Sequence, residues 1–231
     1  SQFPSTTAVH ATTIKTGLTL GQHGIPEFSY YEPILDEVFN ALKTRYTAIP
    51  SMGQTKDSRL GAVYNLGGSF ANDLAFHDIP CFAFEPESHI ETPFNTKLDH
   101  RTTVAHYTSP SQGLDLLRQK LESHKGRGYF SYYDPFLDKL AHQLGPDHAE
   151  VQQHASNILG TIHERLVKDL KSPRTALLLF ADHGQTAVDP RATYFIDTEI
   201  QGINDHLRTN RHNFPHIFTG SNRDLFLYVK I

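Results

Sequence analysis

Runs of apolar residues alternate along the chain with polar, glycine-containing or proline-containing segments, and the spacing within each run separates expected strands from expected helices. Short apolar or aromatic runs predict strands over residues 79–84, 103–107, 129–133 and 174–180. The run at 174–180 is the most apolar of these and shows no alternation, which is typical of a central strand covered on both faces. Two further strands are expected at 193–196 and 225–229.

Helical periodicity fills the segments between these runs. Apolar residues of the segment 33–42 share one face behind a proline that suits a first helical turn, so a helix is expected there. Ser109, Pro110 and Gln112 have the pattern of an N-cap, a first helical residue and a capping box. Residues 87–102 are expected to form a polar surface excursion. Further helices are expected over 147–170, capped by Asp147, and over 199–209.

Strands that alternate with helices of ten or more residues predict an α/β fold, here a three-layer sandwich around a central, mostly parallel sheet. No shift in composition marks a domain boundary, so residues 1–231 are expected to form a single domain. The chain begins at Ser1 without a methionine and stops at Ile231 directly after a strand-like run. We therefore expect it to be a piece of a longer protein, truncated at both ends.

Composition narrows the function classes. A hydrophobic content of 38% places the 231-residue chain among folded proteins, and a formal charge of −4 argues against non-specific binding to nucleic acid or anionic membranes. Cys81 is the single cysteine, so a thiolate zinc knuckle is excluded within one chain and any metal must be held by histidines and carboxylates. No apolar run approaches a membrane span, so we expect a soluble protein, with the cytoplasm slightly favoured.

The first residues of the chain combine hydroxyl side chains with a helix start. The segment Phe3–Thr7 reads as a loop that feeds a helix ending at Gly17. A hydroxyl at the positive end of a helix dipole, beside unpaired backbone N–H groups, suits a nucleophile that acts on a phosphate. Taken alone, an ordinary Ser/Thr cap is the more frequent explanation. Downstream, His10 is placed to line such a site and His23 to orient the loop beneath the helix.

Two acid–histidine pairs have the composition of metal ligands. Asp182 and His183 directly follow the expected central strand, and ligands bind at the carboxyl ends of strands in open α/β sheets. Asp138 and His142 are four residues apart, which places both on one face of a helix. Each pair also has an ordinary explanation. An aspartate in the place of Asp182 commonly caps a turn, and Asp138 and His142 have the spacing of a common surface carboxylate–imidazole pair. Asp134 competes with Asp138 but lacks a histidine at the right spacing.

Taken together and in this order, these stretches resemble the type I phosphodiesterase/nucleotide pyrophosphatase branch of the alkaline phosphatase superfamily. The matching segments are Phe3–Thr7, Thr16–Leu18, His23–Ile25, Asp138–Pro146, Ala181–Gly184 and Gly220–Leu227. The resemblance implies an alkaline-phosphatase-like core and two divalent metal ions, usually zinc, with manganese as an alternative. By position, Thr7 matches the nucleophile, which also binds metal. Asp138 and His142 match the ligands of one ion. Asp182 and His183 match the ligands of the other.

The same resemblance implies hydrolysis of a small phosphate ester rather than a nucleic acid polymer, through a covalent phospho-threonine that water then releases. Three features depart from the family pattern. An upstream Asp and a late His of that pattern are absent from the sequence, and Phe28, beside Glu27, takes the position of an oxyanion-binding Asn. The substrate is therefore open, and the alternative is a catalytically incomplete fragment or a non-enzymatic relative that keeps the fold. A sulfatase fits less well, because its Cys/Ser-x-Pro-x-Arg pattern does not occur.

Overall fold

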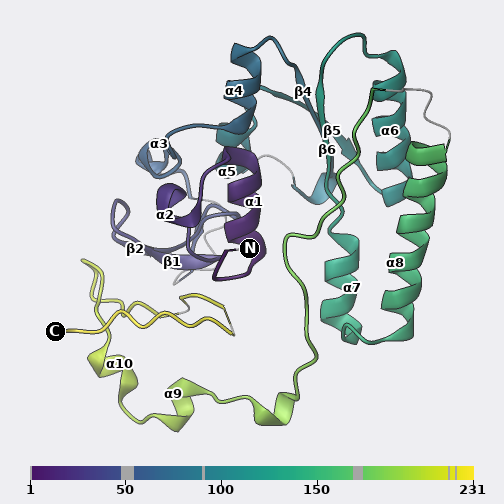
Figure 1. Cartoon of the computed structure of the whole chain (residues 1–231). Helices are drawn as coiled ribbons and strands as arrows, with labels where there is room; N and C mark the ends of the chain where they lie inside the picture. Colours follow the sequence, from purple (N-terminus) through teal and green to yellow (C-terminus); the bar gives the residue numbers. More distant parts are fainter. Residues whose placement is uncertain (1, 48–54, 90–91, 169–173, 218, 222) are drawn as a thin grey trace. The chain divides into compact units, whose positions relative to one another are not determined.

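The computed structural model describes residues 2–47, 55–89, 92–168, 174–217, 219–221 and 223–231. The chain divides into two compact units (Figure 1). The first unit comprises Ser1–Phe70, Glu91–His100 and Asp189–Ile231, and the second comprises Ala71–Ile90 and Arg101–Val188. The single domain expected over residues 1–231 stays a prediction.

A parallel sheet forms the centre of the second unit. Its strands are β4 (Cys81–Pro86), β5 (Thr102–Tyr107) and β6 (Tyr129–Tyr132), in the order β5-β4-β6. Both neighbours run parallel to β4, with Phe84 opposite Ala105 on one side and Tyr132 on the other. Every residue of β4 is buried, as a central strand of a parallel sheet requires. These strands confirm three of the expected strands and the α/β fold class.

Helices flank this sheet. Helix α6 (Pro110–Ser123) begins as the sequence predicts, because Ser109 Oγ accepts a hydrogen bond from the Gln112 N–H at 3.3 Å. It packs against all three strands and buries Leu114 and Leu117 against the sheet. The other helical segments of this unit are α4 (Phe70–Phe76), η2 (Glu87–His89), α7 (Phe136–Leu144), α8 (Ala149–Ile162) and the π-helical η3 (His163–Lys168). Helix α8 is capped by His148 rather than by the expected Asp147.

The strand expected over 174–180 is wrong. In the part of the chain that the structure describes, residues 175–180 have no regular secondary structure and pair with no strand, and Leu177, Leu178, Leu179 and Phe180 are between 49% and 83% exposed. An apolar, β-branched or aromatic run raises strand propensity, but a strand also requires an edge with which to pair. The composition of this run therefore did not determine whether it pairs.

An antiparallel sheet lies in the first unit. Its strands β1 (Ser29–Glu32), β2 (Glu37–Asn40) and β3 (Arg45–Tyr46) follow one another in the order β1-β2-β3. The helix expected over 33–42 is wrong, because residues 33–36 form a turn in which Asp36 has a φ of 54° and donates its N–H to the Glu32 carbonyl at 2.9 Å. The apolar positions that suggested a helical face belong partly to this turn and partly to β2.

Short helices complete the core of the first unit. They are α1 (Thr7–Thr16), α2 (Leu20–His23), α3 (Leu60–Val63) and α5 (Pro93–Leu98). Helix α1 ends at Gly17, whose φ of 74° is the left-handed conformation expected of a glycine cap. The polar surface excursion expected over 87–102 is wrong in part, since α5 buries Phe94 and Leu98 in the core with Leu35 and Phe39.

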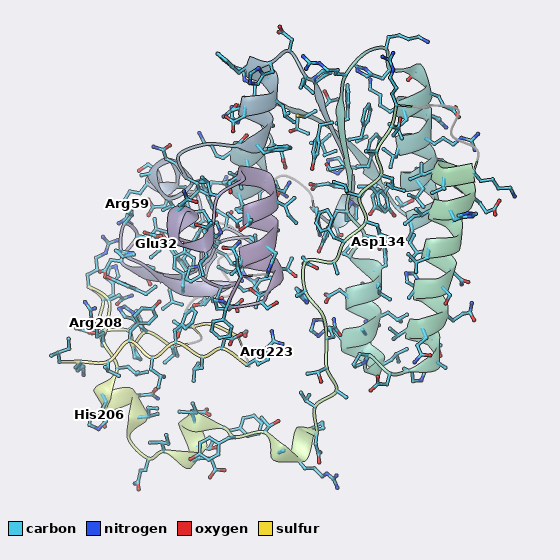
Figure 2. All side chains as sticks on the ribbon, in the orientation of Figure 1. Glu32, Arg59, Asp134, His206, Arg208 and Arg223 are labelled. Atoms are coloured by element: carbon cyan, nitrogen blue, oxygen red, sulfur yellow. The ribbon has the colours of Figure 1, made fainter. Side chains whose placement is uncertain are left out.

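The C-terminal segment of the first unit contains little regular structure. Its helical turns are η4 (Pro190–Ala192), α9 (Ile196–Glu199) and α10 (Ile203–His206). The strand expected at 193–196 is therefore wrong, and the helix expected over 199–209 is reduced to α10. In place of the expected final strand, isolated bridges join Leu207 to Val229 and Gly220 to Leu225. Arg208 and Arg223 both come from this segment (Figure 2).

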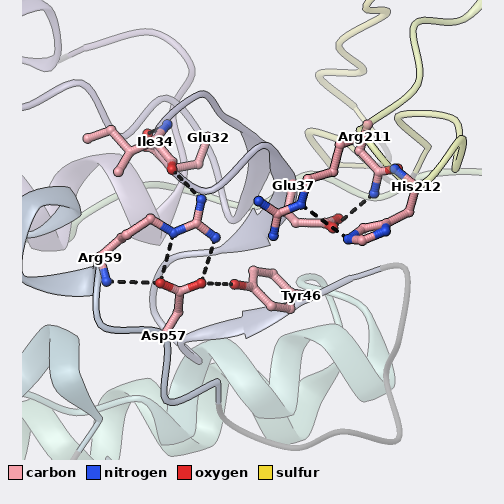
Figure 3. Close-up of polar contacts among 9 residues, drawn as sticks. Glu32, Ile34, Glu37, Tyr46, Asp57, Arg59, Arg211 and His212 are labelled. Carbon is pink, nitrogen blue, oxygen red and sulfur yellow. Dashed lines mark hydrogen bonds and ion pairs between the residues drawn. The ribbon is translucent and has the colours of Figure 1, made fainter.

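A polar network joins the β1–β2 turn to the residues that precede α3 (Figure 3). Arg59 donates to Asp57 at 2.9 and 2.7 Å and to the Ile34 carbonyl at 2.8 Å, while the Tyr46 hydroxyl donates to Asp57 at 2.9 Å. These donors, the Arg59 guanidinium first, hold the pKa of Asp57 well below its usual range. Asp57 is therefore ionised, and its carboxylate joins Arg59 to Tyr46 in the first unit.

No helix in the described parts of the chain is both long enough and apolar enough to span a membrane.

Candidate functional site

The first candidate residue, Thr7, opens helix α1. Thr6 is the N-cap, with an extended backbone (φ −133°, ψ 159°) and no capping hydrogen bond from its side chain. Thr7 is half-buried in the first turn, where the helix dipole favours an anion and the first N–H groups lack intrahelical partners. The structure thus confirms a hydroxyl residue at the cap and places the expected nucleophile one residue beyond it.

Two histidines support this helix. His23 is buried, its Nδ1 accepts from the Ile25 N–H at 3.1 Å, and its Nε2 lies 3.2 Å from the Thr13 hydroxyl. Burial lowers the pKa of His23, so the neutral ring that accepts from Ile25 is the favoured form. His23 therefore orients the loop beneath α1, as the sequence suggests. His10 Nδ1 lies 3.1 Å from the Thr6 carbonyl, which ties its ring to the helix start.

The first acid–histidine pair stands on α7. Asp138 and His142 are separated by one helical turn, and Asp138 Oδ1 lies 3.6 Å from His142 Nε2. The pair is open to solvent, with the His142 side chain 70% exposed. The spacing that suggested one helical face is confirmed.

The second pair follows the extended 175–180 segment. Asp182 Oδ2 lies 3.6 Å from His183 Nε2, and both side chains are at most one-fifth exposed. The His183 Nδ1 lies 2.9 Å from the Gly184 carbonyl, which favours the tautomer whose Nδ1–H donates there. Asp182 Oδ2 is buried without a hydrogen-bond partner. A buried carboxylate oxygen of this kind is costly unless a cation or a proton reaches it.

The structure brings the two pairs together within the second unit. The side-chain amide of Gln185, three residues after Asp182, donates to the Asp138 carbonyl at 3.1 Å and to the Asp138 carboxylate. Burial first, and then the negative charges of Asp182 and Asp138, raise the pKa of the Tyr133 hydroxyl. Gln185 and Tyr133 are not among the site residues expected from the sequence. Their positions next to the ligand motifs are the signal that could have found them.

Asp134 has a different role from Asp138. Asp134, labelled in Figure 2, accepts through Oδ1 a hydrogen bond from the Phe136 N–H at 2.8 Å, just before α7, whose N-cap is Pro135. Burial raises the pKa of Asp134, and both its Oδ2 and the His154 Nε2 are buried without a hydrogen-bond partner. Asp138 is the acid that lies beside His142, and its choice over Asp134 as a metal ligand stays a prediction.

The donor sets of the two pairs fit divalent metals of the zinc class. A carboxylate oxygen and an imidazole nitrogen are both zinc ligands, and a tetrahedral ion with bonds of about 2.1 Å needs ligands roughly 3.4 Å apart. Both pairs show 3.6 Å between such atoms. Among the described residues, no group of three or more His, Cys, Asp or Glu side chains is arranged to hold one metal. Each pair thus contributes two side-chain donors, while Thr7 belongs to the first unit.

Comparison with known proteins gives one family. The family model described as type I phosphodiesterase/nucleotide pyrophosphatase matches residues 1–222. A comparison with curated proteins produced no match.

Proposed function

This chain belongs to the type I phosphodiesterase/nucleotide pyrophosphatase family, and we propose that it hydrolyses a small phosphate ester with Thr7 as nucleophile. The proposal rests on two acid–histidine pairs of the second unit, in each of which the donor atoms have the spacing of metal ligands. A hydrogen bond from Gln185, which follows the second pair, to Asp138 of the first pair connects them. The proposed cofactors are two divalent ions, zinc or, as the alternative, manganese.

Asp138 and His142 would hold one ion, and Asp182 and His183 would hold the other. When bound, such ions supply positive charge that lowers the pKa of a hydroxyl and neutralises phosphoryl oxygens. Gln185 keeps the Asp138 carboxylate in place, and the contact between His183 Nδ1 and the Gly184 carbonyl keeps Nε2 as the binding atom.

Thr7 performs the covalent step in this proposal. Its hydroxyl proton passes to solvent and its oxygen attacks phosphorus. The bond from phosphorus to the leaving alkoxide breaks, the alkoxide takes a proton from water, and a phospho-threonine forms. Water then attacks phosphorus, releases phosphate or a phosphate monoester, and restores the hydroxyl. The first turn of α1 assists, because its N–H groups and dipole favour the negative charge of the phosphoryl group.

The test uses the full chain with bis(p-nitrophenyl) phosphate in the presence of Zn²⁺ or Mn²⁺. We expect Thr7→Ala to abolish turnover, Thr7→Ser to retain part of it, and Thr198→Ala, an exposed threonine of α9, to leave it unchanged. Acid quenching followed by peptide mass spectrometry should find one added p-nitrophenylphosphoryl group on the peptide that contains Thr7, because the first step expels only one of the two p-nitrophenolates. Unchanged turnover in Thr7→Ala would refute the role of Thr7.

The second candidate is a relative that keeps the fold with an incomplete metal site. This candidate is favoured because each acid–histidine pair supplies two side-chain ligands, whereas a tetrahedral zinc site needs more ligands than two. Metal analysis of the purified chain separates the two candidates, because two tightly held ions per molecule would contradict the second one.

A further inference from the structure

A hydrogen-bond network beside helix α1 begins at Gln2, shortly before the proposed nucleophile. The side-chain nitrogen of Gln2 donates to the hydroxyl of Thr13, a residue of α1. The side-chain oxygen of Gln2 accepts from the backbone N–H of Leu20, the first residue of α2. One glutamine side chain therefore connects the two helices, which pack against each other in the first unit (Figure 1).

His23 contacts the same threonine from α2. It is buried, its Nδ1 accepts from the Ile25 N–H at 3.1 Å, and its Nε2 lies 3.2 Å from Thr13 Oγ1. Because a backbone N–H can only donate, Nδ1 must carry a lone pair, and the proton of the neutral ring is on Nε2. Nε2 therefore donates to Thr13, whose hydroxyl oxygen accepts from both Gln2 and His23 and so uses both of its lone pairs.

The segment from Gln2 to Thr6 leads directly into the helix start that carries Thr7. At one end of this segment, the Gln2 N–H donates to His10 Nε2 at 3.4 Å. At the other end, His10 Nδ1 lies 3.1 Å from the Thr6 carbonyl. Contacts at both ends restrict where the segment enters α1, and they therefore also restrict where the Thr7 hydroxyl lies.

We propose that Gln2 and His23 are positioning residues for Thr7, and that protonation of His23 loosens the start of α1. This inference rests on the proposed function only for the role of Thr7. A second proton on the His23 ring would occupy Nδ1, toward which the Ile25 N–H points, so the hydrogen bond would become a contact between two donors. The ring would then leave this position, and Thr13 would lose one of the two donors that fix its hydroxyl.

The surroundings of His23 give the direction of the pH dependence. The two partners of the ring, Thr13 of α1 and Ile25 of the following loop, are uncharged, and the network contains one further titratable side chain, His10, which contacts the Gln2 backbone. Burial lowers the pKa of His23. The stability that the neutral ring provides is therefore complete above the unfolded-state pKa of 6.5 and is lost as the pH falls through the lower folded-state pKa. The start of α1 should be ordered at neutral pH and loosen in acid.

Nuclear magnetic resonance of the isotope-labelled full chain tests the role of His23 without measuring activity. We expect a neutral His23 ring with its proton on Nε2 at neutral pH, and a Thr7 amide signal that shifts as this ring is protonated. His23→Asn keeps an oxygen that can accept from the N–H two residues further on, as asparagine does in turns, but it cannot titrate. In this variant, the part of the Thr7 shift that follows the His23 ring should be lost.

His206→Asn is the matched control, because it removes an exposed histidine of α10 in the same unit. It should retain the full pH-dependent shift of the Thr7 amide. Acid also protonates the proposed metal ligands, but it does so equally in the parent chain and in both variants. The difference between His23→Asn and the parent chain therefore isolates the effect of His23.

Two substitutions test the role of Gln2. Gln2→Glu keeps the oxygen that accepts from Leu20 but removes the donor to Thr13, whereas Gln2→Ala removes both contacts. We expect the Thr7 amide signal to move in both variants, and to move further in Gln2→Ala. Turnover of bis(p-nitrophenyl) phosphate at neutral pH should fall by up to about 100-fold in Gln2→Ala with an unchanged KM, because the position of the nucleophile changes and substrate binding does not.

A Thr7 amide that is insensitive to protonation of His23, or that follows the His10 ring instead, would overturn the role of His23. An unchanged Thr7 signal in Gln2→Ala would overturn the role of Gln2. An inactive parent chain would count against the proposed hydrolysis alone, because the resonance signals do not require turnover. If circular dichroism shows that His23→Asn does not fold, the ring titration of the parent chain and the two Gln2 variants decide the outcome.

Discussion

Replacing Gly113 in α6 with alanine should destabilise the second unit, although alanine is the better helix former. Helix propensity alone would favour the substitution by about 0.5–1 kcal/mol. However, a Cβ at this position would stand 2.7 Å from Tyr107 Cδ1 and 2.7 Å from Tyr132 Cε2. The two rings lie at the junction between α6 and the parallel sheet, so the substitution tests how tightly this helix packs.

The magnitude follows from the rigidity of the two rings. The 2.7 Å separations are about 0.7 Å short of the 3.4 Å at which ordinary contact begins. Tyr107 is completely buried, stacks on Tyr132 with ring centroids 5.3 Å apart, and donates its hydroxyl hydrogen to the Tyr133 carbonyl. Neither ring can move aside without losing these contacts, so α6 must shift from the sheet. Overpacking of this kind costs about 1–3 kcal/mol, which exceeds the propensity gain.

The assay compares urea unfolding of Gly113→Ala with that of Gly160→Ala. Gly160 is an exposed glycine of α8 in the same unit, and nothing lies within 4 Å of an added Cβ. We expect Gly160→Ala to raise the unfolding midpoint, by about 0.5–1 kcal/mol in free energy, and Gly113→Ala to lower it at an unchanged m-value. If Gly113→Ala stabilises the protein as Gly160→Ala does, the close packing of α6 on Tyr107 and Tyr132 is wrong.

Three further predictions concern other parts of the chain. Leu35→Ala, at a completely buried turn position, should cost about 2–5 kcal/mol of unfolding free energy, whereas the neighbouring, exposed Ile34→Ala should change it by less than about 0.5 kcal/mol; equal effects in urea unfolding would contradict the turn. The pKa of Asp57 is lower in the folded state than the unfolded-state pKa of 3.8. The stabilisation by its charge is therefore complete above pH 3.8 and is lost as the pH falls through the folded-state pKa. Asp57→Asn should consequently make the free energy of unfolding less dependent on pH in the acid range. Gln185→Ala should weaken zinc binding by about 10–100-fold in a competition titration with a chelator, because it removes the donor that holds a ligand carboxylate, and an unchanged affinity would refute that role.

Local signals in the sequence predicted the elements whose ends are fixed by their own residues. Ser109, Pro110 and Gln112 determine where α6 begins, and Gly17 determines where α1 ends, so neither needed tertiary information. The β1–β2 hairpin could not be predicted in this way. Its apolar residues repeat at helical spacing, and only the left-handed backbone of Asp36 and the pairing of the strands reveal the turn. Pairing is a long-range property that periodicity does not contain.

In the candidate site, too, relations between residues close in sequence could be predicted, and contacts between distant residues could not. Asp138 and His142 could be paired from their spacing, and Asp182 and His183 from their adjacency, because both relations are local. The contact of Gln185 with Asp138 spans 47 residues and could not be deduced from either motif. In the sequence, Glu27 is distinguished only as the neighbour of Phe28. Its complete burial beside Thr6 and Asp224 depends on the return of the C-terminal segment, which no local pattern records.

The extended segment that precedes Asp182 explains why the Gln185 contact matters. In an open α/β sheet, a ligand loop is normally positioned by the strand that ends at it. In the described part of this chain, residues 175–180 join no sheet, so strand pairing does not fix the loop that follows. The loop is instead held by side-chain contacts, from Gln185 to Asp138 and from the His183 ring to the Gly184 carbonyl. The geometry of the second proposed ligand pair therefore depends on a few polar contacts, and the proposed ion between Asp182 and His183 would add the strongest of them.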